Sequence, residues 1–233
     1  MNRIIVALVL GASISSANAA LINRGGGLIY DDVLGITWLQ DANYAMTSGF
    51  DVDGMITWDT AVGWVDSLVY SNSGGTYADW RLPTVIDTGS VGCPTNDWAG
   101  TDCGWNVDTS TGEMASLFYD TLGNLAYYDT SGSPQSGSGL SNTGPFTNLQ
   151  SHLYWTGTDW SPTGAFINGF GGTSGTPGSA VWAGLQSIDD KTHDWYAWAV
   201  RDGDVAAVPI PAAFWLFGSA LGLLGWMHRK AAY

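Results

Sequence analysis

The chain is poor in positive charge. Seven lysines and arginines stand against 21 acidic residues, and the formal net charge is −14. The stretch from Ala20 to Ala207 holds all 21 acids and only four cations, which leaves it a formal charge of −17. A surface of this sign repels nucleic acids, anionic lipids and sulfated glycans. We therefore exclude nucleic acid as a partner and expect a soluble domain that attracts divalent cations.

Glutamate and histidine are also scarce. Glu113 is the only Glu, and the short Asp side chains suit turns and rigid loops better than helix surfaces. His152 and His193 are the only histidines between residues 20 and 207, without a His-x-x-x-His pair or a Cys/His zinc spacing. A triad of His193, Asp194 and a serine is an easy match in a serine-rich chain. We therefore expect no catalytic residues and no enzyme.

Only two cysteines are present, Cys93 and Cys103. In an oxidising compartment an isolated pair forms a disulfide. Its loop is short, so the bond would stabilise the fold by about 2–3 kcal/mol by constraining the unfolded chain. A reactive pair is the alternative, but no cation or histidine lies nearby in the sequence to lower a thiol pKa.

Tryptophan and glycine, by contrast, are abundant. The chain has 13 Trp and 32 Gly, and so many aromatic residues are typical of a loop-rich extracellular domain rather than a disordered chain. No internal repeat is present. Residues 20–207 are long enough for one domain with a sizeable core.

The N-terminal end has the pattern of a signal peptide. Arg3 supplies a positive start, Ile4–Ala12 is apolar, and Ala17 and Ala19 satisfy the small-x-small cleavage rule. We therefore predict a signal peptide over residues 1–19 and export of the chain.

A second apolar segment lies near the end of the chain. The twenty residues from Val208 to Met227 carry no charge, and twenty helical residues rise about 30 Å, the thickness of a bilayer core. Basic residues follow at once, so the positive-inside rule places this end in the cytoplasm and the domain outside. We therefore predict that residues 208–233 hold a transmembrane helix in the inner membrane.

The same segment resembles a known family of sorting signals. Val208, Pro209 and Pro211 precede a helix rich in Trp, Leu and Phe, and Arg229 and Lys230 follow it, as in VPLPA-type PEP-CTERM signals. The resemblance implies recognition by an exosortase-type membrane protease or transpeptidase. That partner would release the protein to the cell surface or extracellular matrix. A cleaved signal and a retained anchor both remain open.

Local patterns predict short strands and two helices. Leu28–Tyr30 and Ile36–Leu39 are apolar runs joined by a turn, which indicates a hairpin. Apolar residues recur at helical spacing over Trp58–Val69. Ser110 and Glu113 form a capping box that predicts the start of a second helix. Three aromatic strands are expected within residues 152–160, 179–187 and 195–204.

Four blocks of the domain resemble, in order, the Lcl C-terminal family. They are Gly27–Tyr44, Trp80–Thr84, Tyr154–Trp160 and Tyr196–Asp204. The Arg-Leu-Pro-Thr run in the second block also resembles the formylglycine-generating enzyme group, a variant of the C-type lectin fold. Relative to that group, this chain would have an insertion between the Arg-Leu-Pro-Thr run and the helix at Glu113.

The resemblance implies an α+β domain of C-type lectin-like fold over residues 20–207. Two helices would pack on a small twisted antiparallel sheet, the first and last strands would pair, and long loops would lie on one side. With the C-terminal transmembrane helix, this is the predicted fold class. Arg81 is expected to be a structural ion-pair partner rather than a ligand contact.

Glycan binding is the function that the Lcl family suggests. Trp155, Asp159 and Trp160 lie at the edge between a strand and a loop, where rings can stack on sugar C–H faces and a carboxylate can bind hydroxyls. Because alternate strand positions face inward, at least one of the two tryptophans must be structural.

The residues together predict a secreted, surface-sorted, non-catalytic protein that binds polysaccharide or another extracellular matrix component. Its charge would repel the acidic glycans linked to the Lcl family unless cations bridge the contact. A structural matrix or adhesion protein without a defined small ligand is the alternative, and an enzyme on the same fold is a more distant one.

Acidic loops also offer candidate metal ligands. Asp51 and Asp53 make half of a calcium-loop pattern, and Asp97 and Asp102 lie in the cysteine loop. A third acidic cluster lies within residues 189–194. Oxygen-rich rigid loops suit Ca²⁺, which is the candidate cofactor, and a solvated turn is the alternative for each cluster.

Overall fold

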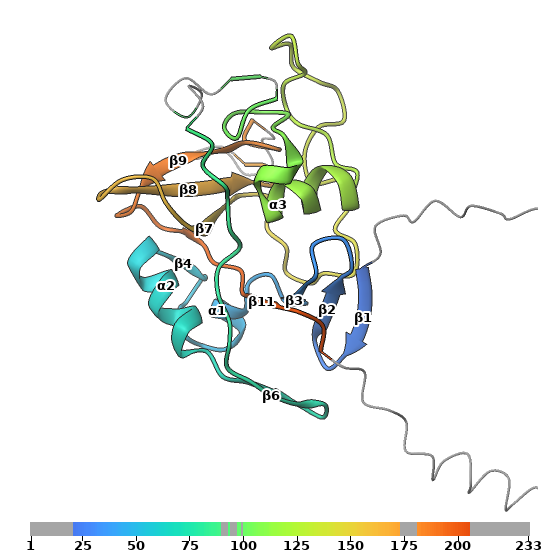
Figure 1. Ribbon diagram of the computed structural model, residues 1–233, viewed down its shortest axis with the longest axis vertical. Helices are drawn as coiled ribbons and strands as arrows, with labels where there is room; N and C mark the ends of the chain where they lie inside the picture. Colours follow the sequence, from blue (N-terminus) through green and yellow to red (C-terminus); the bar gives the residue numbers. More distant parts are fainter. Residues whose placement is uncertain (1–20, 90–92, 94–96, 99, 173–180, 206–233) are drawn as a thin grey trace, which may run out of the picture.

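The computed structural model describes residues 21–89, 93, 97–98, 100–172 and 181–205. The structure is mostly β, with 32% strand and 15% helix, and its three α-helices are short (Figure 1). Two sheets, of four and five strands, and a separate two-stranded hairpin form the framework of the described residues. The predicted α+β class, with a lectin-like pair of helices on one small sheet, is therefore wrong.

The transmembrane helix of the predicted fold class is not supported either. Among the residues that the structure describes, no helix is long and apolar enough to cross a membrane. The segment predicted for it, 208–233, and the predicted signal peptide, 1–19, lie outside the described residues. The fold class is therefore corrected to a mostly β domain.

The first sheet joins the beginning of the domain to its end. Its strands are β1 (Leu21–Gly25), β2 (Leu28–Asp31), β3 (Ile36–Leu39) and β11 (Val200–Asp202), in that order and all antiparallel. The predicted hairpin is confirmed as β2 and β3. Its turn is local, because the Asp31 carboxylate accepts two backbone hydrogen bonds from the residues that follow.

The second sheet carries the long aromatic strands. Its order is β4 (Met55–Ile56), β10 (Trp195–Tyr196), β7 (Leu153–Asp159), β8 (Gly164–Gly169) and β9 (Gln186–Asp190). Only the pair β10–β7 is parallel. The predicted strand in residues 152–160 is confirmed, whereas β8 was not predicted and β9 begins near the end of the range expected for it.

The predicted strand in residues 195–204 splits between the two sheets. β10 belongs to the second sheet and β11 to the first, and the buried residues Ala197, Trp198 and Ala199 connect them. The end of the domain therefore runs through both sheets. A separate hairpin, β5 (Tyr70–Asn72) and β6 (Gly75–Tyr77), lies at the lower edge in Figure 1.

The helices lie between these strands in the sequence. α1 spans Tyr44–Thr47 and α2 spans Trp58–Ser67, so the first predicted helix is confirmed. α3 covers only Glu113–Ser116, after a 3-10 turn at Thr109–Thr111 and before a π-helical turn at Leu117–Thr121.

The second predicted helix is broken up because its capping box does not form. Gly112 is extended, with φ of −147°, and separates the 3-10 turn from α3. The Ser110 hydroxyl donates to Asp108, and the Glu113 carboxylate binds Arg81 instead of an amide of its own turn. Tertiary contacts therefore override the local signal.

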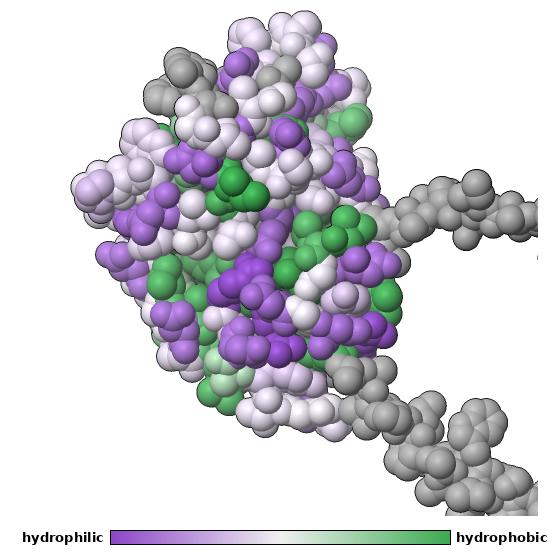
Figure 2. All heavy atoms as spheres, viewed as in Figure 1, coloured by the Kyte–Doolittle hydropathy of each residue, from purple (hydrophilic) through white to green (hydrophobic). Residues whose placement is uncertain are grey.

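Two large apolar clusters form the core, and neighbouring residues of β7 divide between them. Trp155 packs in one cluster with Trp64 and Trp80, and Tyr154 packs in the other with Trp38 and others. Successive strand residues face opposite sides, so one strand serves both clusters. Figure 2 shows hydrophilic residues over much of the visible surface, with hydrophobic residues in separate patches.

Candidate functional site

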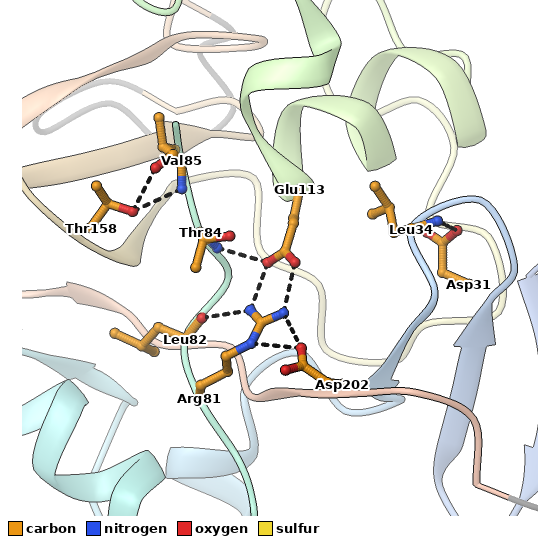
Figure 3. A network of polar contacts seen from close by, with 9 residues as sticks. All are labelled: Asp31, Leu34, Arg81, Leu82, Thr84, Val85, Glu113, Thr158 and Asp202. Atoms are coloured by element: carbon orange, nitrogen blue, oxygen red, sulfur yellow. Dashed lines mark hydrogen bonds and ion pairs between the residues drawn. The ribbon is translucent and has the colours of Figure 1, made fainter. Parts of the chain in front are cut away.

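The Arg-Leu-Pro-Thr run forms a polar network at the centre of the domain (Figure 3). The Arg81 guanidinium donates to both Glu113 oxygens, at 2.8 and 2.7 Å, and twice to one Asp202 oxygen, at 3.0 and 2.6 Å. It also donates to the Leu82 carbonyl, and the Thr84 amide donates to Glu113 at 2.7 Å. Three distant segments, at residues 81–84, 113 and 202, are thereby joined.

The charges in this network pair with one another and stabilise the fold. Burial lowers the pKa of Arg81, but its hydrogen bonds and the charges of Glu113 and Asp202 outweigh burial and hold that pKa above its ordinary value. The guanidinium is therefore saturated by groups of its own chain, as expected for a structural ion pair. It is not a ligand contact.

The chain leaves the core after Thr84 and returns at Glu113. The Glu113 amide donates to the Thr84 carbonyl at 3.1 Å, so the two residues abut although 28 residues lie between them. Val85 is fixed to the neighbouring strand, since its amide and carbonyl both bind the Thr158 hydroxyl. The segment between Thr84 and Glu113 therefore starts and ends at adjacent backbone positions.

The predicted disulfide is confirmed. Cys93 and Cys103 are bonded, their Cα atoms lie 4.9 Å apart, and both residues are buried. They pack in a small apolar cluster with Val85 and Phe166. The bonded cysteines therefore pack against β8 of the second sheet.

Trp155 does not belong to a binding surface. It is 0% exposed, and its indole N–H donates to the Ile56 carbonyl at 2.8 Å. This corrects the prediction that Trp155 contacts a ligand. Of the two tryptophans near this strand end, Trp155 is the structural one.

Asp159 is exposed but is occupied by an ion pair. Its carboxylate binds the Lys191 ammonium, which also lies 3.9 Å from the centre of the Trp58 ring. The ammonium is thus held between a carboxylate and an aromatic face, which is a favourable cation–π geometry. Asp159 therefore positions Lys191 and does not line the hollow described next.

Trp160 is 45% exposed and borders an open hollow of about 300 Å³. This hollow lies where the turn between β7 and β8 meets the end of β9. We call it the Trp160 hollow. Its other lining residues are Ser161, Thr163, Gly164, Ile188, Asp189 and Asp190.

The turn places the Trp160 ring beside Gly164. The Ser161 hydroxyl oxygen accepts the Gly164 amide at 2.9 Å and the Thr163 amide at 3.3 Å. A Cβ at Gly164 would lie 3.3 Å from the Trp160 ring and 3.1 Å from the Ser161 hydroxyl. Glycine therefore allows the close approach that orients the ring.

Two carboxylates give the hollow its charge. The Asp189 carboxylate accepts the Trp195 indole N–H at 2.8 Å and His193 Nδ1–H at 3.0 Å. One Asp190 oxygen accepts the Thr192 amide and hydroxyl, and these bonds hold the pKa of Asp190 below its ordinary value. Within the described part of the chain, the other Asp190 oxygen has no hydrogen-bond donor.

The four predicted metal ligands accept backbone amides. The Asp51 carboxylate accepts two backbone amides and Asp53 accepts one. Asp97 binds the amide that follows it, and Asp102 is buried and accepts the Thr88 amide. No group of three or more acidic, histidine or cysteine side chains suited to a metal occurs in the described ranges. The structure therefore does not bring these four residues together as ligands.

The predicted sorting residues cannot be placed. Val208, Pro209, Pro211, Arg229 and Lys230 all lie outside the described residues.

Several residues of the Trp160 hollow were not among the predicted ligand contacts. Asp189 and Asp190 were recognised only as an acidic cluster, and Thr163 and Ile188 were not singled out. The sequence Trp-Ser-Pro-Thr-Gly carries a turn signal that could have indicated a hairpin here. Their convergence depends on the pairing of β8 with β9, which is a long-range contact.

Comparisons with protein-family models, curated proteins and solved structures find no match for this chain.

Proposed function

We propose that this protein binds neutral polysaccharide chains at the Trp160 hollow without cleaving them. The observation that carries the proposal is a half-exposed indole at a hairpin turn, beside carboxylate and hydroxyl groups in an open hollow. Binding sites of this kind combine an apolar surface with a few placed polar groups.

The Trp160 ring supplies the apolar surface. The C–H face of a sugar ring can cover an exposed indole face and remove apolar area from water. Because the ring lies close to Gly164 at the Ser161 turn, its rotation is restricted on that side and binding would order fewer of its conformers. Ile188 adds an aliphatic contact within the same hollow.

Asp190 and Thr163 supply polar contacts. The lowered pKa keeps Asp190 ionised at neutral pH, and its second oxygen can accept hydrogen bonds from sugar hydroxyls. The Thr163 hydroxyl also has no partner among the residues that the structure describes, and it can donate or accept. These groups match the hydroxyl pattern of a glycan.

The charge of the domain selects against acidic glycans. Two carboxylates line the hollow and the stretch from Ala20 to Ala207 carries a formal charge of −17. Sulfated or uronic acid chains would be repelled, whereas neutral chains would not. The open shape suits a segment of a longer chain better than an enclosed small molecule.

The disulfide supports action in an oxidising compartment, outside the cytoplasm. We propose extracellular matrix polysaccharide as the partner in that setting.

A glycan array of the full chain, with and without added Ca²⁺, tests the proposal. We expect saturable binding to neutral glycans in both conditions and no binding to sulfated ones. Retained glycans should be recovered intact, without new reducing ends. Silence across the array would contradict the proposal, and binding confined to sulfated glycans would contradict its electrostatic argument.

A further inference from the structure

A second cavity borders the polar network around Arg81, on the side that faces away from α2. It has a volume of about 390 Å³ and is larger than the Trp160 hollow, with which it shares no lining residue. Figure 3 shows Leu34, from the turn between β2 and β3, across from Thr84 and Glu113, which also line the cavity. We call it the Ser116 cavity.

One part of its lining is aliphatic. Val33 and Ile86 are 58% and 62% exposed, and Leu34 lies beside Val33 in the same turn. Exposed aliphatic side chains that border one cavity offer a surface for a hydrocarbon stem. In the part of the chain that the structure describes, no aromatic side chain lines this cavity, so it differs in kind from the Trp160 hollow.

The opposite part of the lining is polar and offers groups that no described residue binds. Ser116 is only 5% exposed, yet no partner for its hydroxyl is present among the described residues. Asp120 follows four residues later along the helical turn, and its exposed carboxylate accepts no hydrogen bond in the described part of the chain. The Ser116 oxygen is not one of the fully enclosed unpaired atoms of the described residues, so it can be reached from the cavity and is free to accept a hydrogen bond.

Glu113 lines the same cavity but, unlike Asp120, has both carboxylate oxygens occupied. Both of its oxygens are occupied by Arg81, and one also accepts the Thr84 amide. Among the described residues, no lysine or arginine lines the cavity. The available charge is therefore the Asp120 carboxylate, which favours a cation.

We propose that the Ser116 cavity binds a primary alkylammonium group, either a free amine or a lysine side chain. The ammonium has three donors and no acceptor. It would donate to the Asp120 carboxylate and the Ser116 hydroxyl, while the alkyl stem lies along Leu34 and Ile86. Lysine-like stems commonly cover apolar surface in this way.

Other ligand classes fit less well. A sugar would meet aliphatic rather than aromatic side chains, and an acidic ligand would face Asp120 without a free cation. A divalent cation would find one available carboxylate here, and no group of three acidic, histidine or cysteine side chains exists in the described ranges. An alkylammonium group uses both the charge and the apolar lining.

Isothermal titration calorimetry of the full chain tests this inference. The two amine probes are cadaverine and Nα-acetyl-lysine methylamide, which represent a free amine and a lysine side chain. Pentane-1,5-diol is the uncharged analogue of cadaverine. We expect saturable 1:1 binding of at least one amine and none of the diol, and which amine binds more tightly identifies the source.

Variants distinguish a specific amine site from general attraction by the negative charge of the domain. Asp120→Asn should weaken amine binding about tenfold or more, as expected for loss of a charge-assisted hydrogen bond. Asp66→Asn removes the same charge from the exposed side of α2 and should leave the affinity unchanged. Trp160→Ala should also have no effect, which keeps this test independent of glycan binding. Equal affinities for the wild type and Asp120→Asn, or no saturable binding, would overturn the inference.

Discussion

Trp155 lies within β7 and Trp160 directly follows the strand, five residues later, yet they have opposite environments. Trp155 is fully buried and its indole N–H is satisfied by Ile56, whereas Trp160 is 45% exposed above a turn. A side chain that is fully buried and whose hydrogen-bonding groups are all paired within the fold contributes to stability. A side chain that remains exposed, with its hydrogen-bonding group unpaired, can bind a partner.

The carboxylates of the Arg81 network and of the Trp160 hollow differ in the same way. Glu113 is saturated by Arg81 and Thr84, and Asp190 keeps one oxygen available beside Trp160. The network around Arg81 therefore holds distant segments together, and the Trp160 hollow stabilises little.

The largest expected effect separates the two tryptophans. Trp155→Ala should lower the free energy of unfolding by about 3–5 kcal/mol, because it leaves a large cavity and an unpaired carbonyl in the core. Trp160→Ala should change it by less than about 0.5 kcal/mol. Urea unfolding followed by far-UV circular dichroism measures both, and similar losses for the two variants would refute the comparison.

A smaller effect separates the two ion pairs. Glu113→Gln should cost about 2–3 kcal/mol of stability, because charge-assisted bonds to Arg81 are lost in a partly buried setting. Asp159→Asn removes an exposed partner of Lys191 and should cost about 0–1 kcal/mol. The same urea titration checks the pair, and a larger loss for Asp159→Asn would reverse their assigned roles.

The sequence predicts the features that depend on neighbouring residues. The hairpin of β2 and β3 has a local turn at Asp31, α2 has clear helical spacing, and Cys93 and Cys103 are the only thiols. The structural role of Arg81 was also predicted, although its partners Glu113 and Asp202 were not. These partners come from distant parts of the sequence.

The features that were missed depend on tertiary contacts. β8 is buried along its whole length, so it lacks the alternation that marks a half-buried strand. The helix at Ser110 is interrupted because Glu113 binds Arg81 rather than its own turn. The predicted lectin-like sheet failed for the same reason, since β10 and β11 belong to different sheets although they lie close in sequence.

The smallest expected effect concerns pH and the two histidines. Burial among Trp182, Trp195 and Tyr196 lowers the pKa of His152 from its ordinary value of 6.5. Protonation then favours the unfolded chain, so stability should be complete above pH 6.5 and decline as the pH falls toward the folded pKa. Thermal unfolding between pH 7.5 and 5 should show this decline, and His152→Phe should reduce it.

His193 is the control, since its side chain is 57% exposed. His193→Gln should leave the decline in place. If it removes the decline and His152→Phe does not, burial of His152 is not its cause.

The most direct test of the proposed function compares two equally exposed tryptophans. Trp98 is 44% exposed and does not line the Trp160 hollow. Binding of the full chain to the neutral glycans retained on the array should be lost in Trp160→Ala and unchanged in Trp98→Ala, with both variants folded. Binding that survives in Trp160→Ala, or that is lost equally in both variants, would contradict a glycan site at the Trp160 hollow.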